Sequence, residues 1–136
     1  MSPTFSDVPA PLRLALAGAC LEALCLAAFA VGAVASAVLG GPGGLGVAVP
    51  FAVLLIVFAL LLVGSSRAQW RGMRWGRGPV ITWQLLQIVT VLTVLGTVPP
   101  WGVAAALAVS VGIVVGTLWP SSRDYASTTR STSAVL

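Results

Sequence analysis

The chain has 136 residues, of which 58% are hydrophobic and only 7% are charged, and its mean hydropathy is +1.04. A soluble domain carries roughly 25% charged residues, because it needs a polar surface around its core. The composition therefore excludes an ordinary soluble domain and predicts a membrane protein, whose outward faces must be apolar. Seven arginines against three acidic residues give a net charge of +4. Since the arginines flank apolar runs, we expect anionic lipid headgroups, and not nucleic acid, as their partners.

Four apolar runs follow a polar, proline-broken tail of residues 1–11, and they lie at about residues 12–39, 47–65, 79–98 and 101–119. Each has roughly 19–28 residues, against the roughly 20 that a helix needs to cross the hydrocarbon core. The pattern favours helices over strands, because the spans of a barrel alternate between apolar and polar residues. Residues 53–63 (VLLIVFALLLV) are instead apolar on every side. The runs therefore predict four transmembrane helices.

Short connections separate the four runs. Residues 40–46 (GGPGGLG) predict an uncharged glycine-rich turn, residues 67–78 a basic loop, and Pro99 and Pro100 the end of the third helix. Residues 120–136 are rich in Ser and Thr without an apolar period, which predicts a disordered cytoplasmic tail. The expected fold is all-α, a four-transmembrane-helix bundle over residues 12–119 that runs up-down-up-down with short loops.

The arginines predict the orientation. They lie before the first run, between the second and third runs, and after the fourth, whereas the two opposite connections carry no charge. The positive-inside rule then places both termini and the basic loop in the cytoplasm (N-in/C-in), in a multi-pass protein of the cytoplasmic (inner) membrane. The alternative for the first run is a cleaved signal peptide, with Arg13 before it and a small-residue site at 33–37 (AVASA). Its apolar stretch is longer than the usual signal core and contains Glu22.

Glu22 is the most suggestive polar residue of the first run. If the hydrocarbon region begins near Leu12, a rise of about 1.5 Å per residue puts Glu22 about 15 Å deep. If the first turns protrude into the headgroups, Glu22 lies within two turns of the interface. A carboxylate inside the hydrocarbon is costly to charge, so it should be protonated, paired or open to a wet cavity.

The third run supplies the expected partners of Glu22. Gln84 and Gln87 enter from the same side, and the candidate intramembrane polar site is therefore Glu22, Gln84, Gln87 and Thr90. At about 100° per residue, one face that should point into the bundle carries Thr82, Trp83, Gln87, Thr90, Thr93 and Thr97. The site is interpreted as a structural hydrogen-bond network, at about 0.6–2 kcal/mol per bond, or as an ion- or cation-coupling site.

Small residues recur every four positions along two of the runs. The fourth run carries Ala104, Ala108, Gly112 and Gly116, and the first carries Ala28, Gly32, Ser36 and Gly40. Small side chains let another helix approach closely. The rows therefore predict helix packing within the monomer, or the face of a homodimer or larger membrane complex, and both alternatives stay open.

The basic loop interleaves cations with tryptophans at Arg67, Trp70, Arg71, Arg74, Trp75 and Arg77. We expect Arg67, Arg71 and Arg74 to share a helical face. Each arginine gains about 1 kcal/mol from an anionic membrane surface. The loop is interpreted as a lipid-headgroup anchor, with contact to a partner protein as the alternative.

Residues for catalysis are scarce. The chain has no histidine, no cluster of metal ligands, no phosphate-binding glycine motif and no adjacent pair of acids. Cys20 and Cys25 point about 140° apart on a helix, so they are interpreted as small packing residues. We therefore expect no enzyme activity, no catalytic residue, no cofactor and no metal.

Two resemblances follow from these features. The passage RWGRGPVITWQLLQ (74–87), in an Ala/Val/Gly-rich chain with arginine in place of lysine, resembles small uncharacterised integral membrane proteins of high-GC actinobacteria. That resemblance implies four helices and an inner-membrane location, without an assigned activity. The architecture is also similar to that of small multidrug resistance transporters, whose membrane-embedded glutamate and fourth-helix glycines correspond to Glu22 and to Gly112 and Gly116. The four loop arginines and the Gln/Thr-rich third run depart from that family's pattern.

Two functions are therefore expected. The first is a non-catalytic accessory or interaction protein of the cytoplasmic membrane. The alternative is a small dimeric proton-coupled exporter of lipophilic cations that uses Glu22.

Overall fold

The computed structural model describes residues 7–93, 95–97 and 99–133, with side chains as far as Ser127. Every regular element longer than a single bridge is helical, which confirms the all-α prediction for this part of the chain. The elements are α1 (Ala10–Val38), α2 (Gly44–Trp70), the 3-10 turn η1 (Arg74–Gly76), α3 (Arg77–Thr93), α4 (Pro100–Leu118) and α5 (Pro120–Ser133).

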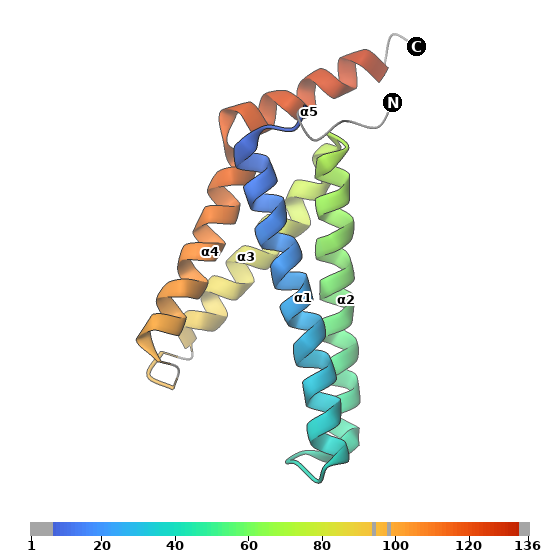
Figure 1. Ribbon diagram of the computed structural model, residues 1–136, viewed down its shortest axis with the longest axis vertical. Helices are drawn as coiled ribbons and strands as arrows, with labels where there is room; N and C mark the ends of the chain where they lie inside the picture. The colour runs from blue at the N-terminus through green and yellow to red at the C-terminus, as the bar shows by residue number, and fades with distance from the viewer. Residues whose placement is uncertain (1–6, 94, 98, 134–136) are drawn as a thin grey trace.

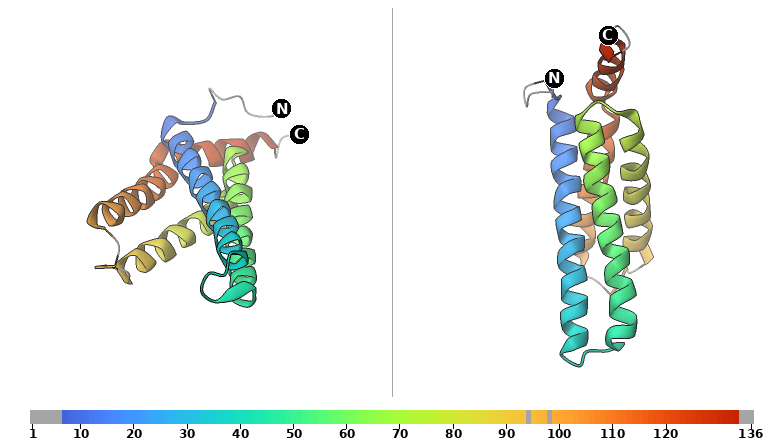
Figure 2. Two further views of the ribbon diagram at one scale, coloured as in Figure 1. Left: turned by 60° about the horizontal axis from the view of Figure 1, so that its bottom comes forward. Right: turned by 90° about the vertical axis from the view of Figure 1, so that its right-hand side faces the viewer.

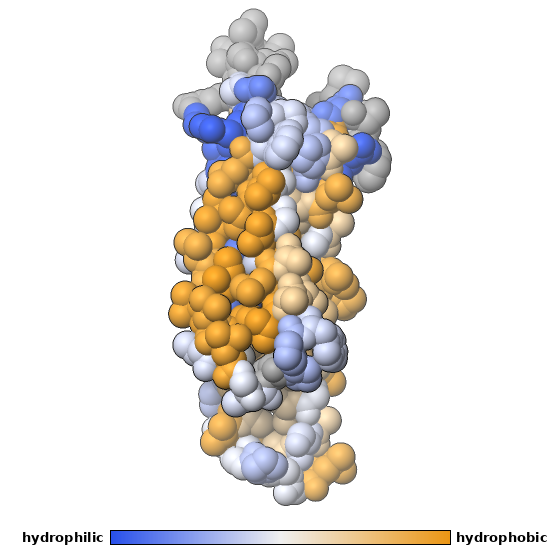
Figure 3. All heavy atoms as spheres, turned by 90° about the vertical axis from the view of Figure 1, so that its left-hand side faces the viewer, coloured by the Kyte–Doolittle hydropathy of each residue, from blue (hydrophilic) through white to orange (hydrophobic). Residues whose placement is uncertain are grey.

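Three of these helices, α1, α2 and α4, are long and apolar enough to cross a membrane. Most large hydrophobic side chains on their surfaces are exposed, as on α2, where Val53, Leu54 and Leu60 are at least half exposed. Figure 3 shows hydrophobic side chains covering the middle of one face and hydrophilic side chains gathered at one end. Because so much apolar surface would be unfavourable in water, the chain has the character of an integral membrane protein.

The helices form two hairpins, α1–α2 and α3–α4, that meet at one end and diverge toward the other (Figures 1 and 2). We call the end where they meet the arginine end, because the start of α1, the end of α2, η1, the start of α3 and α5 all lie there and carry the arginines. The opposite end is the turn end. There α1 reverses into α2 through Gly40 and Gly43, whose φ angles of 84° and 85° favour glycine. The four helices therefore do not pack against one another along their whole length.

α1 crosses α4 near the arginine end, and two glycines make this close approach possible. A Cβ added to Gly116 would lie 2.7 Å from the Pro11 carbonyl oxygen and 3.0 Å from Cβ of Ala15. A Cβ added to Gly18 would lie 3.0 Å from Cγ1 of Ile113. The main apolar core gathers around this crossing and consists of Ala15, Ala23, Ala59, Leu62, Val80 and Ile113. These contacts join the two hairpins.

Several predicted boundaries change in the structure. α2 continues to Trp70, so the first part of the expected basic loop is helix. α3 ends at Thr93, and Gly96, with a φ of 89°, lies in the turn that follows. The expectation that the third helix continues to residue 98 is therefore wrong at residues 95–97. Positions 94 and 98 lie outside the described residues, as do 1–6 and 134–136 of the expected tails.

The expected disordered tail at 120–136 is wrong for Pro120–Ser133, which form α5. Proline is favourable at the first position of a helix, where its missing N–H costs nothing. α5 lies across the arginine end (Figure 1), where Ser122 and Ala126 are buried. Tyr125 packs against the apolar cluster of Val8, Leu12 and Leu16. Tertiary contacts thus order a segment whose composition is typical of disorder.

Tyr125 also ties α5 to the end of α2. Its phenol donates a hydrogen bond of 2.9 Å to the Trp70 carbonyl oxygen. Burial raises the pKa of the Tyr125 phenol above its ordinary value of 10.0, and the negative charge of Asp7 acts in the same direction. The phenol therefore keeps its proton, and this hydrogen bond, at neutral pH.

Candidate functional site

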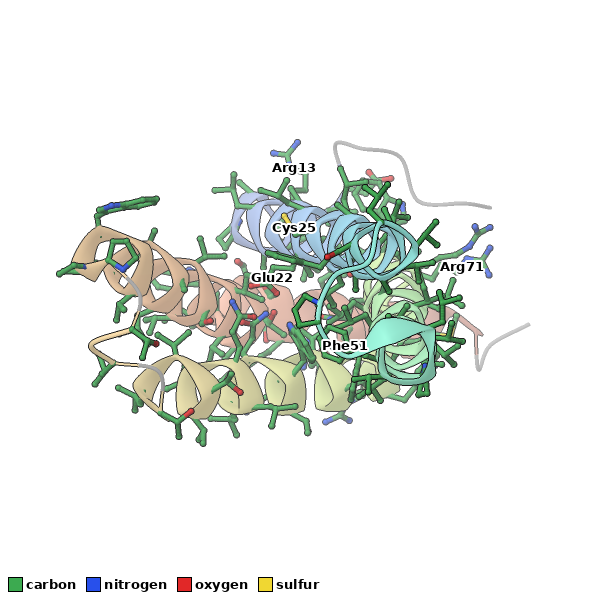
Figure 4. The ribbon with its side chains drawn as sticks, turned by 90° about the horizontal axis from the view of Figure 1, so that it is seen from below. Arg13, Glu22, Cys25, Phe51 and Arg71 are labelled. Atoms are coloured by element: carbon green, nitrogen blue, oxygen red, sulfur yellow. The ribbon has the colours of Figure 1, made fainter. Side chains whose placement is uncertain are left out.

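Glu22 lies where the two hairpins begin to diverge. It follows Gly18 by one helical turn, so it sits just beyond the contact of α1 with Ile113 of α4. Figure 4 shows the Glu22 carboxylate pointing from α1 into the space bounded by α3 and α4, whereas Arg13 and Arg71 point outward. The carboxylate is therefore held inside the helical part of the molecule.

Of the two glutamines expected as partners of Glu22, the structure places Gln84 in direct contact with it. The Gln84 side-chain nitrogen, Nε2, donates a 2.7 Å hydrogen bond to Oε2 of Glu22, and Gln84 is fully buried. Trp83 and Gln87, from the same segment of α3, are further polar neighbours of the carboxylate. The Trp83 ring packs against Phe58 of α2, with 5.1 Å between the ring centroids. These contacts orient the carboxylate from one side.

A cavity of about 450 Å³ lies against Glu22, between α1, α3 and α4. Besides Glu22 it is lined by Leu21, Cys25, Leu26, Phe29, Trp83, Leu86, Gln87, Thr90, Val91, Ala105, Ala106 and Val109. A second hollow of about 410 Å³ shares Cys25 and Phe29 with it and continues along α1 to Phe51 of α2. Together they form an apolar cleft with one carboxylate, which we call the Glu22 cleft.

Three polar atoms beside the Glu22 cleft are buried without a hydrogen-bond partner among the described residues. They are Oε1 of Glu22, Nε1 of Trp83 and Oε1 of Gln84. A buried polar group left without a partner costs about 1–3 kcal/mol. The site therefore offers two acceptors and one donor to a molecule that enters the cleft.

Thr90 lines the Glu22 cleft, but its hydroxyl does not bond to Glu22. It donates to the Leu86 carbonyl of its own helix at 2.8 Å, and Thr93 donates to the Thr90 carbonyl at 2.7 Å. Thr82, Thr90, Thr93 and Thr97 are all exposed. The expectation that this stripe points into the bundle is therefore wrong for Thr82, Thr93 and Thr97, whereas Thr90 faces the cleft between α1, α3 and α4. Threonine hydroxyls in helices commonly satisfy themselves on the preceding turn, so they need no neighbouring helix.

The small-residue row of α4 divides into two parts. Gly116 is buried in the crossing with α1, whereas Ala104, Ala108 and Gly112 are exposed, and a Cβ on Gly112 would have nothing within 4 Å. On α1, Ala28, Gly32 and Ser36 are exposed as well. Only the Gly116 end of the α4 row therefore packs within the monomer.

The residues of the basic loop do not share one face. Arg67 belongs to the last turn of α2, Arg71 follows that helix, Arg74 lies in η1, and Arg77 begins α3. The shared helical face expected for Arg67, Arg71 and Arg74 is therefore wrong for Arg74, because Gly72, with a φ of 74°, turns the chain before it, whereas the Arg71 N–H still donates to the Arg67 carbonyl oxygen at 3.2 Å at the end of α2. Trp70 is half-buried and Trp75 is exposed.

Within the described ranges 7–93, 95–97 and 99–133, no group of three or more His, Cys, Asp or Glu side chains is arranged to hold a metal ion. Sequence reasoning did not foresee Phe29 as part of the cleft beside Glu22, because apolar residues are common on every helix here. Comparison of the chain with protein-family models, with curated proteins and with solved structures finds no match.

Proposed function

We propose that this membrane protein binds lipophilic cations in the Glu22 cleft and exchanges them for protons. The observation that carries the proposal is the buried, unpartnered Oε1 of Glu22 in an apolar cavity of about 450 Å³. An organic cation with apolar substituents matches both features, since it supplies a charge for the carboxylate and apolar surface for the walls. Aromatic rings next to the carboxylate, such as that of Trp83, also attract cations.

Exchange follows from having one carboxylate at the site. Glu22 holds either a proton or an organic cation, so binding of the cation releases the proton. Cation binding should therefore weaken as the pH falls. If the site opens to each side of the membrane in turn, the same exchange supports proton-coupled export. The proposed exporter is a dimer, as in the small multidrug resistance transporters that the architecture resembles.

The proposed topology has four transmembrane helices in the cytoplasmic membrane, with both termini in the cytoplasm. α4 is apolar and long enough to cross, and Trp101 and Trp119 flank it as interfacial aromatics. α3 begins at the arginine end and leads to the start of α4 at the other end (Figure 1), so it supports a fourth crossing despite its 17 residues. The arginines at one end and the resemblance of 74–87 to small actinobacterial membrane proteins support this orientation.

Cys25 provides a direct test, because it lines the Glu22 cleft and is a free thiol. In a Cys20→Ala protein, a maleimide should modify Cys25 more slowly when tetraphenylphosphonium is present, and this protection should weaken at low pH. A neutral compound of the same shape should protect at least about tenfold less strongly, because it lacks the charge. The matched control is Cys20, studied in a Cys25→Ala protein, which should react at an unchanged rate. Equal protection of both thiols, or by both compounds, would contradict the proposal.

A second candidate function is that of an accessory protein that assembles through α4. Its support is the exposed small-residue face of Ala104, Ala108 and Gly112. If this face forms a homodimer or joins a larger complex, Gly112→Leu should abolish crosslinking between copies in the membrane while the monomer stays folded. The monomer has space for that side chain, since nothing lies within 4 Å of the Cβ position. Unchanged crosslinking, or none in the wild type, would remove the support for a homodimer through this face.

A further inference from the structure

A separate polar hollow of about 310 Å³ lies at the arginine end, away from the Glu22 cleft. Its lining comes from η1, from the start of α3 and from α5, and comprises Arg74, Arg77, Pro120, Arg123, Asp124 and Ser127. We call it the arginine pocket. Arg74 and Arg77, which are close together in the sequence, meet Arg123 from a distant part of the chain there, because α5 folds back over the end of the helices.

The pocket is held in shape by hydrogen bonds. The Arg77 guanidinium nitrogen Nη2 donates to the Ser122 carbonyl oxygen at 2.6 Å, and the Ser122 hydroxyl donates to the Gly116 carbonyl oxygen at 2.8 Å. The Gln69 side chain donates to the Gly76 carbonyl oxygen at 3.1 Å, which fastens η1 to α2. A Cβ on Gly76 would lie 2.5 Å from the Ser65 carbonyl oxygen, so η1 sits directly on α2. The arginines are therefore presented by a rigid frame.

The charge in the pocket is unbalanced. Three arginines and one aspartate give +3 − 1 = +2. The positive charges of Arg74 and Arg123 act on Arg77, which is itself partly removed from solvent. Holding like charges close together is unfavourable unless an anion lies between them. A ligand with about two negative charges would neutralise the site.

Two exposed tryptophans place the pocket at the membrane surface. Trp75 belongs to η1 and is 59% exposed, and Trp119, which precedes α5, is 50% exposed. Tryptophan prefers the level of the lipid headgroups. The apolar surfaces of α3 and α4 continue from the same end, so acyl chains can lie along them.

We propose that the arginine pocket binds the headgroup of a phospholipid that carries two negative charges, with its phosphate oxygens accepting hydrogen bonds from Arg74, Arg77 and Arg123. Guanidinium groups pair with phosphate through charge-assisted hydrogen bonds, and basic pockets at the ends of transmembrane helices bind such headgroups. Binding at this site differs from binding to a diffuse basic surface in two respects. It requires Arg123 of α5, and the negative charge of Asp124 weakens it.

The test is lipid titration of the intact protein in nanodiscs of phosphatidylcholine, with cardiolipin, phosphatidic acid or phosphatidylglycerol added. Bound lipid is counted by native mass spectrometry. We expect one cardiolipin or phosphatidic acid molecule to bind in preference to phosphatidylglycerol. Arg123→Gln should weaken this binding about fivefold. The matched control Arg71→Gln removes the same charge from an exposed position at the same end and should leave the binding nearly unchanged.

Asp124→Asn should strengthen lipid binding, because it removes a negative charge from the pocket. Misfolding of a variant would weaken binding, so a gain in affinity cannot result from misfolding. Equal losses for Arg123→Gln and Arg71→Gln would show a diffuse surface and overturn the proposal, as would unchanged binding in both. Inorganic phosphate and pyrophosphate are added in a separate arm without anionic lipid. Binding of these ions as tightly as cardiolipin would identify a soluble phosphate ligand and overturn the assignment to a lipid.

Discussion

Replacing Glu22 with Gln should weaken the binding of lipophilic cations at least about tenfold while leaving the helices folded. The amide of the variant can still accept the hydrogen bond from Gln84 Nε2 that Oε2 accepts at 2.7 Å, so the contact between α1 and α3 is retained. What disappears is the negative charge in an apolar cleft. Interactions of a charged group contribute roughly 1.5–3 kcal/mol, which corresponds to about 10- to 150-fold in affinity.

The measurement is equilibrium binding of radiolabelled tetraphenylphosphonium to purified protein at two pH values. The wild type should bind more weakly at the lower pH, and the Glu22→Gln protein should bind at least about tenfold more weakly than the wild type at the higher pH and show no pH dependence. Asp124→Asn is the matched control, since it removes a carboxylate from the arginine end and not from the Glu22 cleft. A Glu22→Gln protein that binds the cation as tightly as the wild type would show that the cleft recognises shape alone.

Substituting Gly116 with Ala should destabilise the protein, although alanine favours a helix over glycine by about 1 kcal/mol. The new Cβ would lie 2.7 Å from the Pro11 carbonyl oxygen, and this backbone atom cannot move aside as a flexible side chain can. Overfilling a tightly packed contact costs about 1–3 kcal/mol. The steric term therefore outweighs the gain in helix propensity, and the midpoint of thermal unfolding in detergent should fall.

Gly112→Ala is the control, one turn away on the same helix. Nothing lies within 4 Å of its added Cβ, so only the helix propensity acts and stability should be unchanged or higher. Opposite signs for the two variants would support the α1–α4 crossing. A loss of the same size for Gly112→Ala would instead indicate that its face is covered by another helix. Because Glu22 lies one turn beyond the crossing, Gly116→Ala should also weaken cation binding.

The two variants test different parts of one arrangement. The glycines bring α1 and α4 together near the arginine end, and the two hairpins diverge beyond that contact (Figure 2). The cavity beside Glu22 lies between α1, α3 and α4. A bundle closed along its whole length would fill this space with side chains. The divergence of the two hairpins is therefore what leaves room for a ligand beside Glu22.

The amino-acid sequence by itself determined the class of protein and much of its local structure. Apolar runs, prolines and glycines located α1, α2 and α4 to within a few residues at most ends, because hydrocarbon demands continuous apolar helices whatever their neighbours are. The entry of the first and third runs from the same side also indicated Gln84 or Gln87 as the partner of Glu22, and the structure shows the contact with Gln84.

Only the tertiary structure decided how the helices are placed around these residues. Periodicity does not say whether the helix face that carries Thr90 or Gly112 meets lipid or another helix, since lipid and protein interiors are equally apolar. Composition also misled at Pro120–Ser133, where the many Ser and Thr residues indicate disorder but the structure has a helix. That helix is ordered because Ser122 and Ala126 are buried against surfaces supplied by distant parts of the chain. The arginine pocket and the Glu22 cleft both arise from such distant contacts, and these are not encoded in any local pattern.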